Sequence, residues 1–245
     1  MLPDFNAPPK DCGESGCRMK NSSLPLPDQK NHEYGYKLAY KLACEQFAGV
    51  DDVEQQCLRS GARYQVINSQ KVIIVEYLNQ RYQVTFPDID ISLVDGEEEV
   101  PIRDKILILH YLTLAKGIPI SNKLIAFEEL PEGANYFPTF SQRTVESLMA
   151  HFGKQPHQLI DAAGRLGGRE VDYGDAAVTI NGFSRVPITL VLWQGDEEFP
   201  PRGNILFDAT ISDYLSTYDI TMLCEAITWR LVKFLREGGA HSGGT

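Results

Sequence analysis

The sequence predicts an α+β protein in which an antiparallel sheet packs with several helices, one of them a central buried helix near 101–116. Three observations support this class. Short segments dense in Val, Ile, Tyr and Phe follow one another between residues 62 and 94. Helical patterns lie on both sides of this block, without the regular strand–helix alternation of a parallel sheet. The segment 101–116 is apolar almost all round, which is typical of a helix buried in the centre of a domain.

Apolar residues that recur at helical spacing place the other helices. In the first, Tyr40 and Phe47 lie near one face, and Gly49 ends the helix. The second begins after a capping aspartate, Asp51 or Asp52. The predicted helices span 33–48, 52–59, 101–116, 141–152, 155–166 and 219–236.

The β-rich block reads as an antiparallel meander. Asn79-Gln80 marks a hairpin within it, although this turn lacks the usual glycine. The segment 130–140 is rich in proline, glycine and aromatic residues and is predicted to be a loop. The predicted strands span 62–67, 72–78, 81–86, 88–94, 123–128, 175–180, 186–193 and 204–208.

Both ends of the chain are predicted to be tails around a single domain. Residues 1–30 contain five of the fourteen prolines and show no apolar periodicity, so they are expected to be flexible. Residues 238–245 are rich in glycine and serine and are expected to be disordered. The single α+β domain is then expected over 31–237.

Composition excludes several classes of function. The formal net charge is −10, and no run of Lys and Arg offsets it, so nucleic acid and anionic membranes are not expected partners. No secretory signal and no membrane-spanning stretch is present, which predicts a cytoplasmic protein. The sequence also lacks a Walker loop, GxGxxG, GxSxG and HExxH.

The strongest candidate site residues lie in and after the strand 186–193. The loop 195–201 (GDEEFPP) carries three carboxylates, which can raise one another's pKa or hold a hard cation, and two prolines that stiffen it. A solvated loop is the simpler interpretation. The residues proposed to line this cleft are Trp193, Asp196, Glu197, Glu198, Phe199, Asp208 and Tyr214.

Two further segments are candidates for the walls of the same pocket. His110, beside Tyr111 in the apolar helix, suits an axial ligand or a general base, although a core histidine is commoner. Tyr136, Phe137 and Phe140 place three aromatic rings in five positions, either to cap a core edge or to cover a flat ligand. Cys12 and Cys17 are too few for a local metal site, and no other metal-ligand set is predicted.

Four stretches together resemble the domain-of-unknown-function family numbered 3786, seen mainly in anaerobic bacteria and archaea. They span 36–43 (YKLAYKLA), 100–112 (VPIRDKILILHYL), 127–140 (FEELPEGANYFPTF) and 186–215. The resemblance implies no established activity. Some longer relatives carry a four-cysteine iron–sulfur motif ahead of this domain, of which Cys12 and Cys17 look like a remnant.

The leading hypothesis is a cytoplasmic ligand- or metallocofactor-binding accessory protein of anaerobic metabolism. Its cofactor would be a corrinoid or heme-type tetrapyrrole, and its partner a metalloenzyme or corrinoid protein. One alternative is an enzyme that uses the carboxylates of 196–208 for acid–base or cation-assisted chemistry. Another is a protein–protein interaction module that docks through the aromatic segment 136–140.

Overall fold

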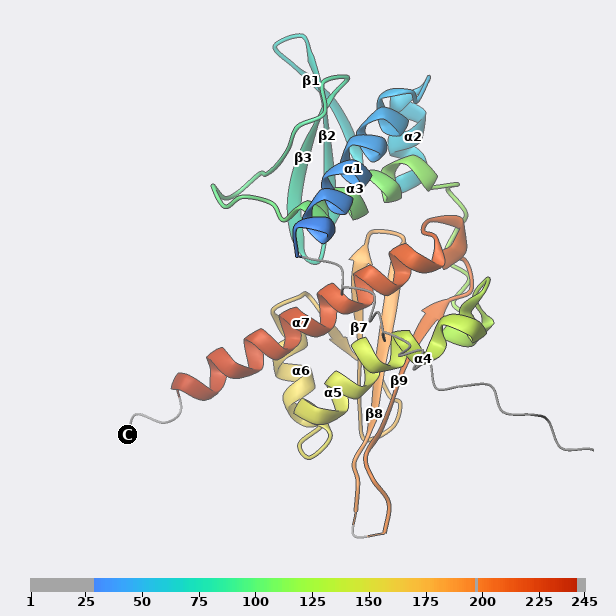
Figure 1. Ribbon diagram of the computed structural model, residues 1–245, viewed down its shortest axis with the longest axis vertical. Helices are drawn as coiled ribbons and strands as arrows, with labels where there is room; N and C mark the ends of the chain where they lie inside the picture. Colours follow the sequence, from blue (N-terminus) through green and yellow to red (C-terminus); the bar gives the residue numbers. More distant parts are fainter. Residues whose placement is uncertain (1–28, 197, 242–245) are drawn as a thin grey trace, which may run out of the picture.

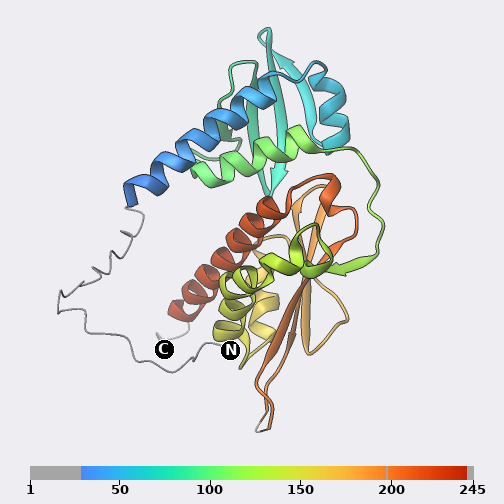
Figure 2. The ribbon, with the colours of Figure 1, turned by 45° about the vertical axis from the view of Figure 1, so that its right-hand side comes forward.

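The computed structural model describes residues 29–196 and 198–241 and confirms the α+β class. Residues 29–114 form an N-terminal lobe, in which two long helices lie side by side across a meander of strands (Figures 1 and 2). Its elements are α1 (Gln29–Ala48), α2 (Val53–Ser60), β1 (Arg63–Ile67), β2 (Gln70–Tyr77), β3 (Gln80–Phe86), β4 (Ile91–Leu93) and α3 (Ile102–Leu114).

Residues 124–241 form a C-terminal lobe, in which helices cover one face of a group of strands (Figure 2). Two one-turn helices, Phe127–Glu129 and Ile211–Asp213, belong to its connections. Its other elements are β5 (Leu124–Ala126), α4 (Gly133–Arg143), α5 (Val145–Phe152), α6 (His157–Gly164), β6 (Arg169–Glu170), β7 (Ala176–Phe183), β8 (Val186–Trp193), β9 (Arg202–Asp208) and α7 (Thr217–His241).

The strands of both lobes join in one nine-stranded sheet, in which all the neighbouring pairs are antiparallel. Its order is β4-β3-β2-β7-β8-β9-β5, with β1 beside β2 and β6 beside β7. The lobes meet where β2 pairs with β7 through Tyr77 and Phe183. The predicted hairpin joins β2 to β3 through Leu78 and Asn79. Their φ angles of 48° and 62° are the two positive values that a type I′ turn needs, here without glycine.

The central helix α3 is buried as predicted and packs between the sheet and α7. Ile108 and Tyr111 have no exposed surface. Polar side chains of α3 and of the segment after it pair with side chains of α7 and of the turn before it, in antiparallel order. The pairs are Arg103–Glu225, Asp104–Arg230, His110–Asp219 and Lys116–Asp213.

Two sequence predictions about local structure were wrong. Most of the predicted loop 130–140 is the helix α4, which contains Pro138. Burial of Phe140 against Phe127, with ring centroids 3.8 Å apart, outweighs the helix-breaking tendency of that proline. The final helix also runs on to His241, into the segment predicted to be a disordered tail. The other tail, residues 1–28, lies outside the described residues.

No helix in residues 29–196 or 198–241 is long and apolar enough to cross a membrane.

The Asp104–Arg230 pair is predicted to matter more for stability than the exposed pairs at the same junction. Arg230→Met should lower the free energy of unfolding by about 3 kcal/mol, because it leaves the buried Asp104 carboxylate without its cation. Lys116→Met, which breaks an exposed pair, should cost under about 1 kcal/mol. Urea denaturation measures both. Equal small decreases in the free energy of unfolding for the two variants would show that the Asp104–Arg230 pair does not hold the two lobes together.

Candidate functional site

His110 and Tyr111 lie at the junction of the lobes and both make structural contacts. The Nδ1 atom of His110 lies 2.7 Å from Oδ1 of Asp219, whose side chain is almost fully buried. The Ser216 hydroxyl donates to the other oxygen of this carboxylate at 2.6 Å. Tyr111 stacks on Phe183 with ring centroids 4.0 Å apart. His110 therefore joins α3 to the start of α7, and Tyr111 belongs to the core.

The aromatic segment 136–140 divides between core and surface. Phe140 is buried, Phe137 is half-buried against the core, and only Tyr136 is exposed. These three side chains lie near one another on α4, with the ring centroids of Phe137 and Phe140 6.4 Å apart, but packing covers all of Phe140 and much of Phe137. They do not form a continuous aromatic wall.

The acidic loop closes on itself. Asp196 Oδ1 accepts hydrogen bonds from the backbone N–H groups of Phe199 (2.7 Å) and Glu198 (2.9 Å). These bonds hold the pKa of Asp196 below its usual value, which is the opposite of what a general acid needs. Trp193, Glu198 and Phe199 are exposed nearby. Glu197 lies outside the described residues.

Asp208 and Tyr214 are buried anchors. Asp208 accepts hydrogen bonds from the backbone N–H groups of Ser121, Asn122 and Thr210, and from the Ser121 and Thr210 hydroxyls. Burial raises the pKa of Asp208, but the hydrogen bonds from Thr210 and Ser121 outweigh it, so the pKa is lowered. The Tyr214 hydroxyl donates to the Ile118 carbonyl oxygen. Both residues fasten the segment that connects the lobes.

The structure does not bring these candidate residues into one pocket. The β8–β9 hairpin carries the acidic loop to the end of the molecule away from α3 (Figure 1). Asp208 stands at the opposite end of β9 from that loop, roughly 20 Å away at the usual rise per residue of a strand. The two lobes, however, form a different concave surface where α3 meets α7.

This concave surface runs along the solvent-facing side of α7, and we call it the α7 groove. Two adjoining cavities of about 450 and 530 Å³ make up most of it, within the size range of small-molecule sites. Both are bordered by Arg143, Glu225 and Trp229. The polar and aromatic side chains that line the groove include Arg103 and Asp104 of α3, Arg143 of α4, His151 of α5, and Glu225, Thr228, Trp229, Arg230, Lys233 and Arg236 of α7.

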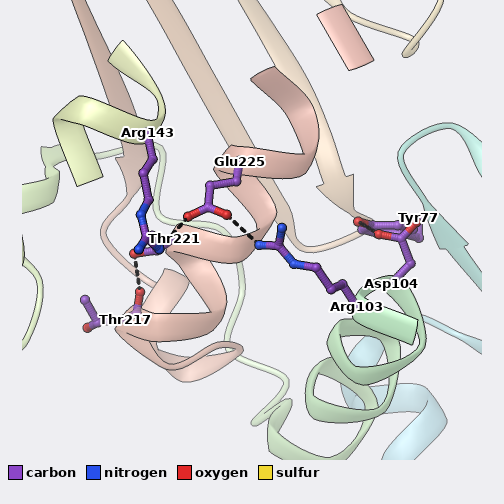
Figure 3. A network of polar contacts seen from close by, with 7 residues as sticks. All are labelled: Tyr77, Arg103, Asp104, Arg143, Thr217, Thr221 and Glu225. Carbon is purple, nitrogen blue, oxygen red and sulfur yellow. Dashed lines mark hydrogen bonds and ion pairs between the residues drawn. The ribbon is translucent and has the colours of Figure 1, made fainter. Parts of the chain in front are cut away.

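Glu225 links three helices at the floor of the groove. Its two carboxylate oxygens accept hydrogen bonds from Arg103 at 2.5 Å and from Arg143 at 3.2 Å (Figure 3). Beside it, Asp104 accepts from Tyr77 at 2.8 Å and from Arg230 at 2.7 Å. Burial raises the pKa of Tyr77 well above its usual value, so its hydroxyl keeps the proton that it donates. These contacts orient the cations before any ligand arrives.

The α7 groove is positively charged on a protein whose net charge is −10. Glu225 is shared by two arginines, and Glu237 lies 2.6 Å from Arg165 and 3.9 Å from Lys233. Within the described part of the chain, Arg236 has no carboxylate within ion-pair distance. Five cations (Arg103, Arg143, Arg230, Lys233 and Arg236) therefore border the two cavities, against three carboxylates (Asp104, Glu225 and Glu237).

Trp229 and His151 provide the groove with an aromatic face and an imidazole. Trp229 is 64% exposed, and the Lys233 ammonium lies 5.6 Å from the centre of its ring. His151 Nδ1 lies 2.8 Å from the Ser147 carbonyl oxygen, which can only accept, so Nδ1 carries the hydrogen. Its Nε2 lies 3.4 Å from Arg236. A flat anion placed here would meet a ring face and several cations together.

The sequence interpretation missed this site because its residues are far apart along the chain. The cations come from α3, α4 and α7, and none belongs to a basic run. One signal was available. The buried face of the last helix, with Ile220, Leu223 and Ile227, leaves Trp229 on the polar face. A tryptophan there, beside Arg230 and Lys233, lies outside the core.

The described residues contain no metal site. Among them, no group of three or more His, Cys, Asp and Glu side chains is placed to hold an ion. Cys12 and Cys17 lie outside these residues. Cys57 and Cys224 are buried, as expected for helix cysteines, and burial raises the pKa of Cys57 to about 12. A thiol with such a pKa stays protonated and is a poor metal ligand.

Asp208 is predicted to act on stability in a pH-dependent way. Asp208→Asn should lower the free energy of unfolding at neutral pH by about 2 kcal/mol, because several buried donors lose a charged acceptor. The pKa of Asp208 is lowered in the folded state, so its contribution is complete above its unfolded pKa of about 4 and is lost as pH falls through the folded value.

The difference between Asp208→Asn and wild type should therefore shrink below about pH 4. Asp95→Asn is the control, since its carboxylate forms an exposed pair with Arg81. A difference that persists unchanged at acidic pH would contradict the role assigned to Asp208.

Comparison with known proteins gives a family. No curated protein and no solved structure matches the chain. Residues 52–230 match the sequence model of a family described as a domain of unknown function (DUF3786). The matched segment contains α3, α4 and the part of α7 that carries Trp229. Because the match covers well over half of the sequence, the chain belongs to the family described as a domain of unknown function (DUF3786).

Proposed function

We propose that the protein binds an organic anion with a flat or apolar body in the α7 groove, as a cytoplasmic accessory protein of anaerobic metabolism. Trp229 carries this proposal. An exposed tryptophan alone needs no explanation, because soluble proteins expose scattered apolar side chains. Trp229, however, borders both cavities of a groove where cations outnumber carboxylates. The aromatic ring suits the flat body of such a ligand, and the cations of the concave surface suit its anionic group.

The larger cavity supplies a place for the body of such a ligand. It lies between α3 and α7, and Leu107, Met222 and Ala226 contribute to its lining. Apolar side chains beside the Arg103–Glu225–Arg143 network give the groove an apolar part and a charged part. Burying an apolar ligand body there contributes about 25 cal/mol per Å² of surface removed from water.

Within this class of ligands we propose a tetrapyrrole, which the resemblance to the DUF3786 family suggests. Heme carries free carboxylates, whereas most carboxylates of a cobalamin are amidated, so the charge of the groove favours the heme type. His151 is the histidine of this cavity, with Nδ1 held by a backbone carbonyl as in many metal-ligating histidines. Bound heme would supply redox chemistry, His151 would hold its iron, and Arg143 and Arg236 would hold its carboxylates.

The other two functions have less support. The carboxylates Asp196 and Asp208 lie at opposite ends of β9, and each is engaged by hydrogen bonds in its own turn. They are therefore not paired for acid–base work. In the aromatic segment only Tyr136 is exposed, which is a small surface for docking a partner.

Fluorescence of Trp229 tests ligand binding directly. The chain has two tryptophans, so Trp193→Phe leaves Trp229 as the only reporter. Anilinonaphthalene sulfonate, a flat aromatic anion, should quench it saturably. Trp229→Ala, titrated through the fluorescence of the probe itself, should bind the probe about tenfold more weakly, because stacking on an aromatic ring contributes about 1–3 kcal/mol. Trp193→Ala, at the far hairpin, should leave the affinity unchanged.

Equal affinity for the probe in wild type and Trp229→Ala would reject the α7 groove as the binding site. Absorption spectra test the finer proposal: hemin should show a shifted and saturable band, and cobalamin should not. An unchanged hemin spectrum would remove the tetrapyrrole and leave the class of flat organic anions.

A further inference from the structure

Thr228 is a buried polar residue without a partner at the wall of the α7 groove. It is 3% exposed and lines the smaller of the two main cavities. Its Oγ1 atom is the one buried side-chain polar atom in the described part of the chain for which no hydrogen bond is found. A buried hydroxyl that makes no hydrogen bond destabilises the fold, so its presence needs a cause.

Other helical threonines of this protein show what Thr228 would ordinarily do. The hydroxyls of Thr113 and Thr221 each donate to the carbonyl oxygen four residues earlier, at 2.7 and 3.0 Å. This contact satisfies a threonine inside a helix. Thr221 lies two turns before Thr228 on the same helix and makes it (Figure 3). The hydroxyl of Thr228 makes no such hydrogen bond.

The cavity beside Thr228 is suited to negative charge. Arg143, Lys233 and Arg236 border it, and within residues 29–196 and 198–241 the only hydrogen-bond or ion-pair partner found for Arg236 is the imidazole of His151. The carboxylates of the same cavity are Glu225 and Glu237. Each is approached by two cations, so neither leaves an unbalanced negative charge facing a ligand.

We propose that this end of the α7 groove is an oxyanion subsite, in which the Thr228 side chain, which lines the cavity, rotates to turn its now enclosed hydroxyl toward a ligand oxygen, and Arg143 and Arg236 balance the charge of the ligand. The inference rests on the proposed function, since it assigns the anionic group of the same ligand. The recognised chemistry is an oxyanion, a carboxylate or a phosphate. A planar guanidinium group can bind either a carboxylate or a phosphate through two parallel N–H···O hydrogen bonds, and a hydroxyl supplies one directional hydrogen bond.

Thr228→Val separates this role from a structural one, because valine keeps the shape and removes the hydroxyl. Wild type should gain melting temperature with added sodium phosphate or sodium acetate, at ionic strength matched with chloride. Thr228→Val should melt higher than wild type without these anions, because an unpaired buried hydroxyl is gone. Thr228→Val should also bind the anion that raises the melting temperature of wild type about tenfold more weakly, as expected for a lost hydrogen bond to a charged group.

Thr221→Val is the matched control on the same helix. It should melt lower than wild type, because it loses a hydrogen bond to Thr217, and should keep the anion response. If only acetate raises the melting temperature of wild type, the anionic group of the ligand is assigned as a carboxylate. If only phosphate raises it, the group is assigned as a phosphate. A lower melting temperature of Thr228→Val, or unchanged anion affinity, would overturn the subsite.

The experiments distinguish a failure of the oxyanion subsite from a failure of the proposed function. If Trp229 still reports saturable binding of anilinonaphthalene sulfonate while neither phosphate nor acetate affects wild type, the subsite is overturned and the groove stands. If Trp229 reports no binding but the anions act through Thr228, the oxyanion site stands and the flat ligand is rejected.

Discussion

The buried carboxylate of Asp104 is the interaction on which the arrangement of the two lobes depends. It lies on α3, accepts the Tyr77 hydroxyl from β2, and binds the Arg230 guanidinium from α7. One group therefore connects the strand at the sheet junction with the two helices that face each other there. A charge removed from water needs partners of this kind, because an unpaired buried carboxylate is strongly destabilising. The pairing thus fixes which turn of α7 faces α3.

The position of the α7 groove follows from this contact. Because α3 lies antiparallel to α7, Arg103 is brought to Glu225, and Arg143 approaches the same carboxylate from α4 (Figure 3). The cations are then held in place by acidic partners that they outnumber. Trp229, one residue before Arg230, is turned to the solvent side of the same helix. The contacts that stabilise the arrangement of the lobes and the residues that border the proposed ligand site consequently lie on the same surface, where α3 meets α7.

Much of the fold could be predicted because its signals are local. The buried helix 101–116 and the strand 186–193 follow from runs of apolar residues, and the structure places α3 and β8 there. The helix α4 could not be predicted in this way, because Pro138 and its aromatic neighbours are typical of a loop. Only the packing of Phe140 against Phe127 makes a helix favourable. The glycine-rich end of α7 reads as a tail, because glycine has a low helix propensity, although the helix runs on to His241.

The site was less predictable, because residue type does not say which partner a side chain will meet. His110 and Asp208 read as candidate functional groups, yet Asp219 and Thr210 engage them as structural anchors. Arg103, Arg143 and Arg236 read as ordinary surface charges until the fold gathers them. Nothing in the sequence marks Thr228 as different from Thr221, since the difference lies in one hydrogen bond that only the structure reveals.

The central claim is that the surface formed where α3 meets α7 is a binding site for a flat anion. The most direct test is a proton–nitrogen NMR spectrum of the two tryptophan indoles during titration with anilinonaphthalene sulfonate. If the α7 groove binds the probe, the Trp229 resonance shifts saturably while that of Trp193, at the far end of β8, stays in place. A shift confined to Trp193, or no saturable shift at either indole, would contradict it.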